Sequence, residues 1–340
     1  MLISSDVPLA SAFDLALVDL DGVAYRGPAP IEHAADSLVA GRRAGLGLVF
    51  VTNNASREPE SVAQQLTDLG IATGPDEVMT AAQAAAAVLG TRLTEGARVL
   101  VVGGAGLLTA VRAAGFVVVT SADDQPDAVV QGFAPEVGWR DLAQAAYAVQ
   151  RGAWYVVSNR DMTLPNEHGL APGNGALVGA VIAATGVEPV SAGKPEPTMF
   201  ELAARQRGAE RTLVIGDRLD TDLAGARAAG YPGLHVFTGV SSARDAVLAA
   251  PHERPSFLGA DLRSLLVAHP VPSRSADGWW VCGKSSARVD GGRLELGGPA
   301  AAAAATTDLV RAACSAAWSV VDDGGHLDVD SVPQLVVQGP

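Results

Sequence analysis

Two short, entirely apolar segments near the start of the chain, separated by one helical repeat, constrain its fold most strongly. Residues 15–18 and 45–51 have the length and composition of buried strands. Between them, apolar residues from 31 to 39 recur at the spacing of one helix face, and a further helix is predicted over 59–70. This β-α-β-α order indicates a parallel sheet with helices on its faces.

The same pattern returns late in the chain, after a long intervening stretch. Strands are predicted at 212–215 and 234–237, on either side of a short helix over 222–229. The intervening stretch has predicted strands of its own, at 98–102, 116–119, 128–130 and 155–157. We therefore expect a doubly wound, Rossmann-like α/β core formed by residues 1–81 and 190–268. An α/β cap domain formed by residues 82–189 would be inserted into it.

Residues 269–340 differ in texture and are expected to form a small C-terminal α/β module. The segment begins with Pro and Ser, continues with predicted strands at 279–282 and 293–296, and contains an Ala-rich helix over 300–318. Two interpretations stay open: a degenerate fragment resembling an acetyltransferase, or a structural or oligomerisation element. The segment lacks a loop for the pyrophosphate of acetyl-CoA, so we assign it no catalysis.

Length and charge exclude several classes of protein. The 340 residues are enough for two or three domains. Lys and Arg total 24 against 37 Asp and Glu, a formal net charge of −13, which argues against non-specific nucleic-acid binding. An anionic substrate would therefore need a local cationic pocket.

Other features of the sequence concern its cellular location. No apolar run approaches the roughly 20 residues of a membrane span, and the first residues do not resemble a signal peptide. Two cysteines, Cys282 and Cys314, make neither a disulfide framework nor a zinc site. We expect a cytoplasmic protein with no membrane or nucleic-acid partner, and leave self-association open.

Two carboxylates follow the first apolar segment. Asp19 and Asp21 are two positions apart, so on an extended backbone they would point to the same side, and Gly22 lets the chain turn directly after them. The carboxyl edge of a parallel sheet is where ligands bind, and two acids there repel unless one is protonated or a cation lies between them. A solvated turn would account for this pair as well.

Polar residues also follow the second apolar segment. Thr52, Asn53 and Asn54 offer a hydroxyl and main-chain amides suited to an anion, although an Asx-type turn is the alternative. Further along, Lys194 lies between Gly193 and Pro195, and a lone loop lysine is usually no more than a surface residue.

The strand predicted at 212–215 also ends in acids. Asp217 follows it at once, and Asp222 comes five residues later. Carboxylates at such a position suit Mg²⁺, which prefers oxygen ligands. Helix capping would explain Asp222 without a metal, but it does not explain Asp217.

Together these four segments resemble the motifs of haloacid dehalogenase superfamily phosphatases. The motifs read Asp-x-Asp-Gly-Val, Thr-Asn-Asn, Gly-Lys-Pro and Gly-Asp-Arg-Leu-x-Thr-Asp, in the family's order and at its spacing. The resemblance covers about residues 15–266. It is to the para-nitrophenylphosphatase branch, which has a large cap between the second and third motifs. Within that branch the chain is most similar to bacterial glycerol 3-phosphate phosphatases.

The resemblance implies a role for each motif. Asp19 would be the nucleophile and become an aspartyl phosphate, and Asp21 the general acid and then the general base. Mg²⁺ would be held by Asp19, the main-chain carbonyl of Asp21, and Asp217, with Asp222 acting through a bound water. The resemblance makes the transferring oxygens contacts of four residues: Thr52, Asn53, Asn54 and Lys194.

The cap would choose the substrate, a small phosphorylated metabolite. Asn159 and Arg160, in the segment Ser158-Asn159-Arg160-Asp161, are the candidate substrate-facing groups, although a structural turn accounts equally well for Asn159. Vertebrate pyridoxal phosphate phosphatases of this branch have a substrate-contacting His where this chain has Leu164. That difference favours a small aliphatic ester.

The sequence thus predicts a Mg²⁺-dependent phosphatase of small phosphate monoesters, with glycerol 3-phosphate as the favoured substrate. Three alternatives stay open: a phosphomutase, a pyridoxal phosphate phosphatase, and a non-enzymatic phospho-acceptor signalling protein. The last presents a similar aspartate, hydroxyl and lysine, but it needs no leaving-group acid.

Overall fold

The computed structural model describes residues 1–166, 168–298 and 305–337. The chain forms two compact units, which are described one at a time. The first comprises residues 1–48 and 207–340, and the second comprises residues 49–206.

A parallel sheet forms the centre of the first unit. Its strands lie in the order β15 (Phe257–Gly259), β14 (Gly233–Val236), β13 (Thr212–Gly216) and β1 (Leu15–Val18). All their residues are buried, as expected for strands covered on both faces. The unit also contains α1 (Leu9–Ala12), α2 (Ala34–Arg43), α9 (Ala224–Ala228), α10 (Ala243–Leu248) and the hairpin β2 (Tyr25–Arg26)–β3 (Ala29–Pro30).

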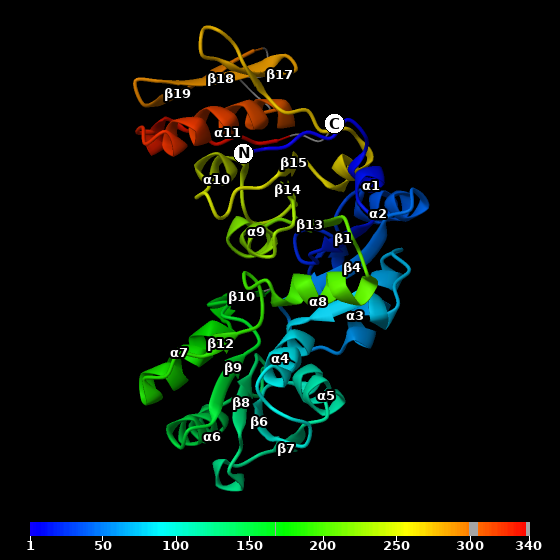
Figure 1. The fold of residues 1–340 in the computed structure, drawn as a ribbon, viewed down its shortest axis with the longest axis vertical. Helices are drawn as coiled ribbons and strands as arrows, with labels where there is room; N and C mark the ends of the chain where they lie inside the picture. The colour runs from blue at the N-terminus through cyan, green and yellow to red at the C-terminus, as the bar shows by residue number, and fades with distance from the viewer. Residues whose placement is uncertain (167, 299–304, 338–340) are drawn as a thin grey trace. The chain divides into compact units, whose positions relative to one another are not determined.

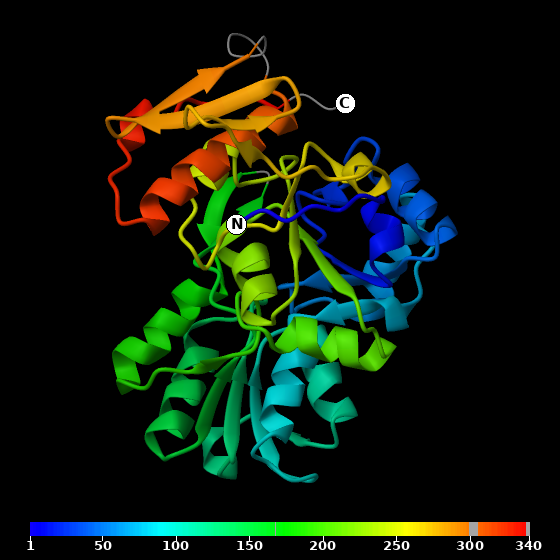
Figure 2. The same cartoon turned by 45° about the horizontal axis from the view of Figure 1, so that its top comes forward.

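The C-terminal segment packs on this unit through one helix. Its antiparallel sheet runs β16 (Ser273–Arg274), β17 (Trp280–Cys282), β18 (Ser285–Asp290) and β19 (Arg293–Gly297). Helix α11 (Thr307–Asp322) lies between this sheet and α10 (Figures 1 and 2). Residues 309–318 are buried and belong to one hydrophobic cluster with residues of α10 and β15. The tail therefore shares a core with the first unit.

The second unit contains a separate parallel sheet. Its strands lie in the order β12 (Val190–Ser191), β9 (Trp154–Val157), β8 (Ala128–Gln131), β6 (Arg98–Val102) and β7 (Val117–Val119) (Figure 1). Strand β4 (Gly47–Thr52), which enters this unit, pairs in parallel with β5 (Val78–Thr80). The hairpin β10 (Thr163–Asn166)–β11 (Gly169–Pro172) is antiparallel. The helices are α3 (Pro59–Asp68), α4 (Ala81–Gly90), α5 (Ala105–Ala113), α6 (Trp139–Gln150), α7 (Asn174–Thr185) and α8 (Thr198–Arg207).

Local sequence explains where several of these helices begin. Thr80 caps α4: its hydroxyl accepts from the N–H of Gln83, and the Gln83 side chain accepts the N–H of Thr80 at 2.8 Å. Ser242 and Asp245 form the same reciprocal pair at the start of α10. Thr306 caps α11 by accepting from the N–H of Leu309.

The predicted fold class is confirmed: parallel sheets covered by helices, with a further small α/β segment at the end. The helix expected over 300–318 is α11, at Thr307–Asp322, and residues 299–304 lie outside the described residues. The predicted division at residues 82, 189 and 268 stays a prediction. The compact units change at 48/49 and 206/207, so the second unit also contains α3, β5 and the Lys194 loop.

Candidate active site

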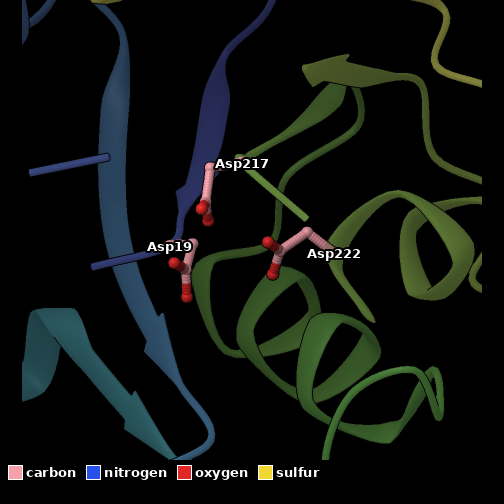
Figure 3. Close-up of side chains that lie close together, drawn as sticks. All are labelled: Asp19, Asp217 and Asp222. Atoms are coloured by element: carbon pink, nitrogen blue, oxygen red, sulfur yellow. The ribbon is translucent and has the colours of Figure 1, made fainter. Parts of the chain in front are cut away.

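Three acidic side chains of the first unit converge where two neighbouring strands end (Figure 3). Asp19 follows β1, and its N–H donates to the carbonyl of Ile215 at 2.9 Å, which extends the pairing of β1 with β13. Asp217 follows β13, and Asp222 lies in the π-helical turn Leu219–Leu223. One carboxylate oxygen from each acid lies within 4.8 Å of the others.

The loop after β14 holds Asp217 in place through main-chain groups. The N–H of Val240 donates to Oδ2 of Asp217 at 2.6 Å, and the N–H of Ser241 donates to the Asp217 carbonyl at 3.0 Å. Ser241 Oγ accepts the N–H of Leu219 at 3.1 Å. Asp222 is held in a similar way, because its Oδ2 accepts the N–H of Arg218 at 3.1 Å. These bonds fix the two buried acids before any ligand binds.

Glycines leave room for the carboxylates. A Cβ at Gly22 or at Gly239 would collide with the Asp217 carboxylate, and a Cβ at Gly216 would collide with Asp222. Gly22 also has φ +87°, which favours glycine, and its carbonyl accepts the Thr238 hydroxyl at 2.6 Å. The acids therefore pack against bare backbone, which fixes their position closely.

The charge and chemistry of this group fit a hard divalent cation. Asp217 and Asp222 are each only 1% exposed, and Asp19 is half-buried. Ionised carboxylates at this distance repel one another unless a cation lies between them, and oxygen ligands suit Mg²⁺. His235, on β14 opposite Gly216, adds no positive charge, because burial lowers its pKa to about 4.

Asp21 is placed differently from the other acids. It is exposed at the turn that follows β1, and its side chain is not one of the three that converge. The turn is closed by the N–H of Gly22, which donates to the Tyr25 carbonyl at 2.8 Å. An exposed carboxyl can exchange protons with water, as a general acid and base must.

The second unit brings the other candidate residues together. Lys194 is 4% exposed, and its Nζ donates to the carbonyl of Val51 at 3.3 Å. The Lys194 main chain pairs with the side chain of Asn53. Thr52, the last residue of β4, accepts the N–H of Asn54 at 3.1 Å through its hydroxyl. The second and third motifs of the sequence are therefore neighbours.

An Asx-type turn is present at Asn54, where the sequence left that alternative open. Oδ1 of Asn54 accepts the N–H of Ser56 at 2.8 Å and the Ser56 hydroxyl at 2.9 Å. This turn leads from β4 toward α3.

The two cap candidates differ in their surroundings. Asn159 is 5% exposed; its Nδ2 donates to the Asn53 carbonyl at 2.7 Å, and its Oδ1 accepts the N–H of Asp161 at 3.1 Å. Arg160 is half-exposed and pairs with Glu188 at 2.6 Å. Asn159 thus bridges two segments of its own unit, whereas Arg160 extends toward the surface.

The structure also adds residues that the sequence did not single out. Gly239 and the main chain of Val240 and Ser241 surround Asp217, and Asp161 contacts Asn53. The signal for Asp161 is an acid shortly after a buried strand. For the loop at 239–241 the only signal is its place after a strand at the ligand-binding edge of the sheet.

Comparisons with known proteins identify the family. A family model described as haloacid dehalogenase-like hydrolase matches residues 16–117, and a second model, for HAD-like hydrolases, matches residues 191–265. The D-glycerol 3-phosphate phosphatase of Mycobacterium tuberculosis is 43% identical over 328 residues, which are 91% of this chain and 87% of that protein. The chain belongs to the haloacid dehalogenase-like hydrolases.

Other members of the family support the same assignment. The acid sugar phosphatase of Staphylococcus aureus is 38% identical over 67% of this chain and 88% of its own length. The crystal structure of the M. tuberculosis glycerol phosphate phosphatase in complex with magnesium matches with a TM-score of 0.82, over 92% of each chain at 42% identity.

The predicted family and its para-nitrophenylphosphatase branch are confirmed. A thermostable p-nitrophenylphosphatase from Geobacillus stearothermophilus matches with a TM-score of 0.67 at 34% identity, over 74% of this chain and 96% of its own. This haloacid dehalogenase-like hydrolase is therefore an enzyme of the phosphatase class. Among its described residues no helix is long and apolar enough to cross a membrane.

Proposed function

We propose that this hydrolase is a Mg²⁺-dependent phosphatase of small phosphate monoesters and that glycerol 3-phosphate is its favoured substrate. The observation that carries the proposal is the convergence of Asp19, Asp217 and Asp222 at the end of β1 and β13. The choice of substrate is supported by the 43% identity to the M. tuberculosis D-glycerol 3-phosphate phosphatase over 91% of this chain.

The proposed reaction has two steps. In the first, a carboxylate oxygen of Asp19 bonds to phosphorus, the ester P–O bond breaks, and Asp21 gives its proton to the leaving alkoxide. In the second, Asp21 takes a proton from water as that water attacks the aspartyl phosphate. This step releases inorganic phosphate and restores Asp19.

Asp19, the main-chain carbonyl of Asp21, and Asp217 would hold Mg²⁺, with Asp222 acting through a bound water. When bound, Mg²⁺ offsets the charge of the carboxylates and of the phosphate dianion. The fit of the acids to such a cation is supported by their oxygen-only donor set and by the glycines around them.

Binding of the phosphate is assigned to the second and third motifs. Thr52, Asn53 and Asn54 would contact its oxygens, and Lys194 would supply the positive charge that a protein of net charge −13 must provide locally. Arg160 is the candidate for contact with the rest of the substrate, since its side chain is half-exposed. Asn159 contributes through the segment that it stabilises.

A panel of phosphate esters, assayed with and without Mg²⁺, tests the proposal. We expect catalytic release of inorganic phosphate, fastest from glycerol 3-phosphate, and none after chelation. A phosphorylated isomer would indicate a phosphomutase, and uptake of a single phosphoryl group without turnover would indicate a phospho-acceptor protein. Faster hydrolysis of pyridoxal phosphate than of glycerol 3-phosphate would overturn the substrate assignment.

A further inference from the structure

We propose that Asn53 is a positioning residue whose side chain holds Lys194 in place and connects it to the cap segment Ser158–Asp161. Its effect on catalysis rests on the proposed function, whereas the hydrogen bonds that carry it do not. Residues 53, 158–161 and 194 all belong to the second unit.

The side-chain amide of Asn53 pairs with both main-chain groups of Lys194. The N–H of Lys194 donates to Oδ1 of Asn53 at 2.8 Å, and Nδ2 of Asn53 donates to the Lys194 carbonyl at 3.2 Å. Two antiparallel bonds to one residue restrict its rotation as well as its position. An asparagine is suited to this pairing, because a single side chain must both accept and donate.

Close packing keeps the neighbouring residue in register. A Cβ at Gly193 would collide with the carbonyl of Ser158 and lie 2.6 Å from Oδ1 of Asn53. The Lys194 side chain then runs to the carbonyl of Val51, two residues before Asn53. Both ends of Lys194 are therefore placed by the segment that ends β4, and a shift of its main chain would carry the ammonium with it.

The same asparagine also contacts the segment after β9. Nδ2 of Asn53 donates to Oδ2 of Asp161 at 3.1 Å, and the Asn53 carbonyl accepts Nδ2 of Asn159 at 2.7 Å. Asn174, at the start of α7, donates to the carbonyl of Asn159 at 2.8 Å. The polar groups of this network support one another, so a change in the cap segment reaches Lys194 through Asn53.

The catalytic consequence follows from the nature of lysine. Its ammonium acts as a point charge, and its benefit depends on distance from the developing charge. A displacement of about 1 Å at a reacting centre can cost about 10²-fold in rate. Asn53→Ala is therefore expected to lower kcat/KM by about 10²-fold although it removes no charge.

A double-mutant cycle between Asn53 and Lys194 tests whether one acts through the other. Asn53→Ala is expected to cost about 10²-fold in the natural chain and less than about threefold in the Lys194→Ala background. Gln144→Ala is the matched control: Gln144, on α6, accepts the N–H of Ala122 at 2.7 Å, and its loss should lower stability without changing kcat. Equal losses from Asn53→Ala in both backgrounds would overturn the proposal.

A spectroscopic measurement tests the hydrogen bonds independently of activity. Lysine occurs only at positions 194 and 284, so protein labelled with ¹⁵N-lysine gives two main-chain amide signals, and Lys284→Arg assigns them. In Asn53→Ala, the Lys194 amide should exchange with solvent at least about tenfold faster, while the Lys284 amide is unchanged. An unchanged Lys194 amide would refute the pairing even if no phosphate ester were hydrolysed.

Exchange of two side chains tests the link to the cap. Asn53→Asp keeps the acceptor for the Lys194 N–H but places a carboxylate against Asp161 and removes the donor. Asp161→Asn in the same chain restores a donor, so the double variant should recover at least about tenfold of the activity lost in Asn53→Asp. No recovery would show that Asp161 is not coupled to Asn53. Loss of all activity in the unmutated chain, with the amide result as expected, would reject the proposed function alone.

Discussion

The main-chain N–H of Val240 donates a 2.6 Å hydrogen bond to Oδ2 of Asp217. The Val240 side chain is 72% exposed, so the contribution of this residue to the site is its backbone. Gly239 precedes it and lies so close that any Cβ would meet the Asp217 carboxylate. A loop that carries no acid of its own thus determines where an acid of the candidate metal site lies.

Gly239→Ala should therefore weaken metal binding without removing a ligand. The added methyl group displaces the Asp217 carboxylate, and we expect the Mg²⁺ concentration for half-maximal activity to rise by about tenfold or more. Isothermal titration with Mg²⁺ measures the same change directly. Gly179→Ala is the control, because nothing lies within 4 Å of a Cβ at this exposed position in α7. It should leave the titration unchanged and raise the free energy of unfolding by up to about 1 kcal/mol.

Asp19→Asn should abolish phosphate release while the fold is retained. The amide has the shape of the carboxylate but is no nucleophile, and a loss of about 10³-fold or more in kcat is expected. Asp220→Asn serves as the control, since Asp220 pairs with Arg218 at 2.7 Å, outside the group of converging acids. Circular dichroism and the thermal midpoint check the fold. A substantial residual rate in Asp19→Asn would exclude it as the nucleophile.

Substitutions of the other two acids should act through the metal. In Asp217→Asn, the Mg²⁺ requirement is expected to rise by about tenfold or more, and in Asp222→Asn by less, because Asp222 is proposed to act through water. Titration with Mn²⁺, followed by electron paramagnetic resonance, reports binding without turnover. An unchanged titration in Asp217→Asn would remove this residue from the set of ligands.

Stability should fall as the pH falls from about 6.5 to about 4, partly because of His269. Burial lowers the pKa of this ring to about 4, where it donates to the Ser264 carbonyl at 2.7 Å and faces the Arg311 guanidinium. The unfolded chain, with an ordinary histidine pKa, binds more protons in this range, so acid favours unfolding. His269→Gln should flatten the plot of unfolding free energy against pH there. A slope as steep as that of the unmutated chain would contradict this.

Trp318→Ala should destabilise the protein without changing its chemistry. Trp318 is among the largest fully buried side chains, its Nε1 donates to the carbonyl of Ala246 at 3.2 Å, and Arg254 lies over its ring. We expect a loss of about 3–5 kcal/mol in urea denaturation and an unchanged kcat at 25 °C. Val321→Ala, at an exposed position of the same helix, should change stability by about 0.5 kcal/mol or less.

The sequence predicted the parts of this protein that depend on local pattern. The apolar residues of β1 and β13 are each followed at once by acids, and parallel strands end at one edge, so convergence of Asp19 with Asp217 could be foreseen. The glycine-rich turn at 103–106 was correctly interpreted as structural. The N–H of Gly106 donates to the carbonyl of Ser56, and a Cβ on Gly106 would collide with the carbonyl of Arg57.

Other features depend on contacts between distant segments. The pairing of Asn53 with Lys194 joins residues 141 positions apart, and the contact with Asp161 spans 108. An asparagine after a strand fits an Asx turn, an anion contact or such a pairing equally well, so periodicity cannot decide among them. The packing of the tail was missed for the same reason, because an Ala-rich helix does not reveal which of its faces are covered.

Helix α11 has apolar contacts on two sides, with the tail sheet on one and with α10 and β15 on the other. A truncated enzyme that ends before β16 would expose the surface on which the helix rests, and would be expected to aggregate. Shortening such a hydrolase to its catalytic core would therefore require a redesign of that surface with polar residues. A stop codon alone would not suffice.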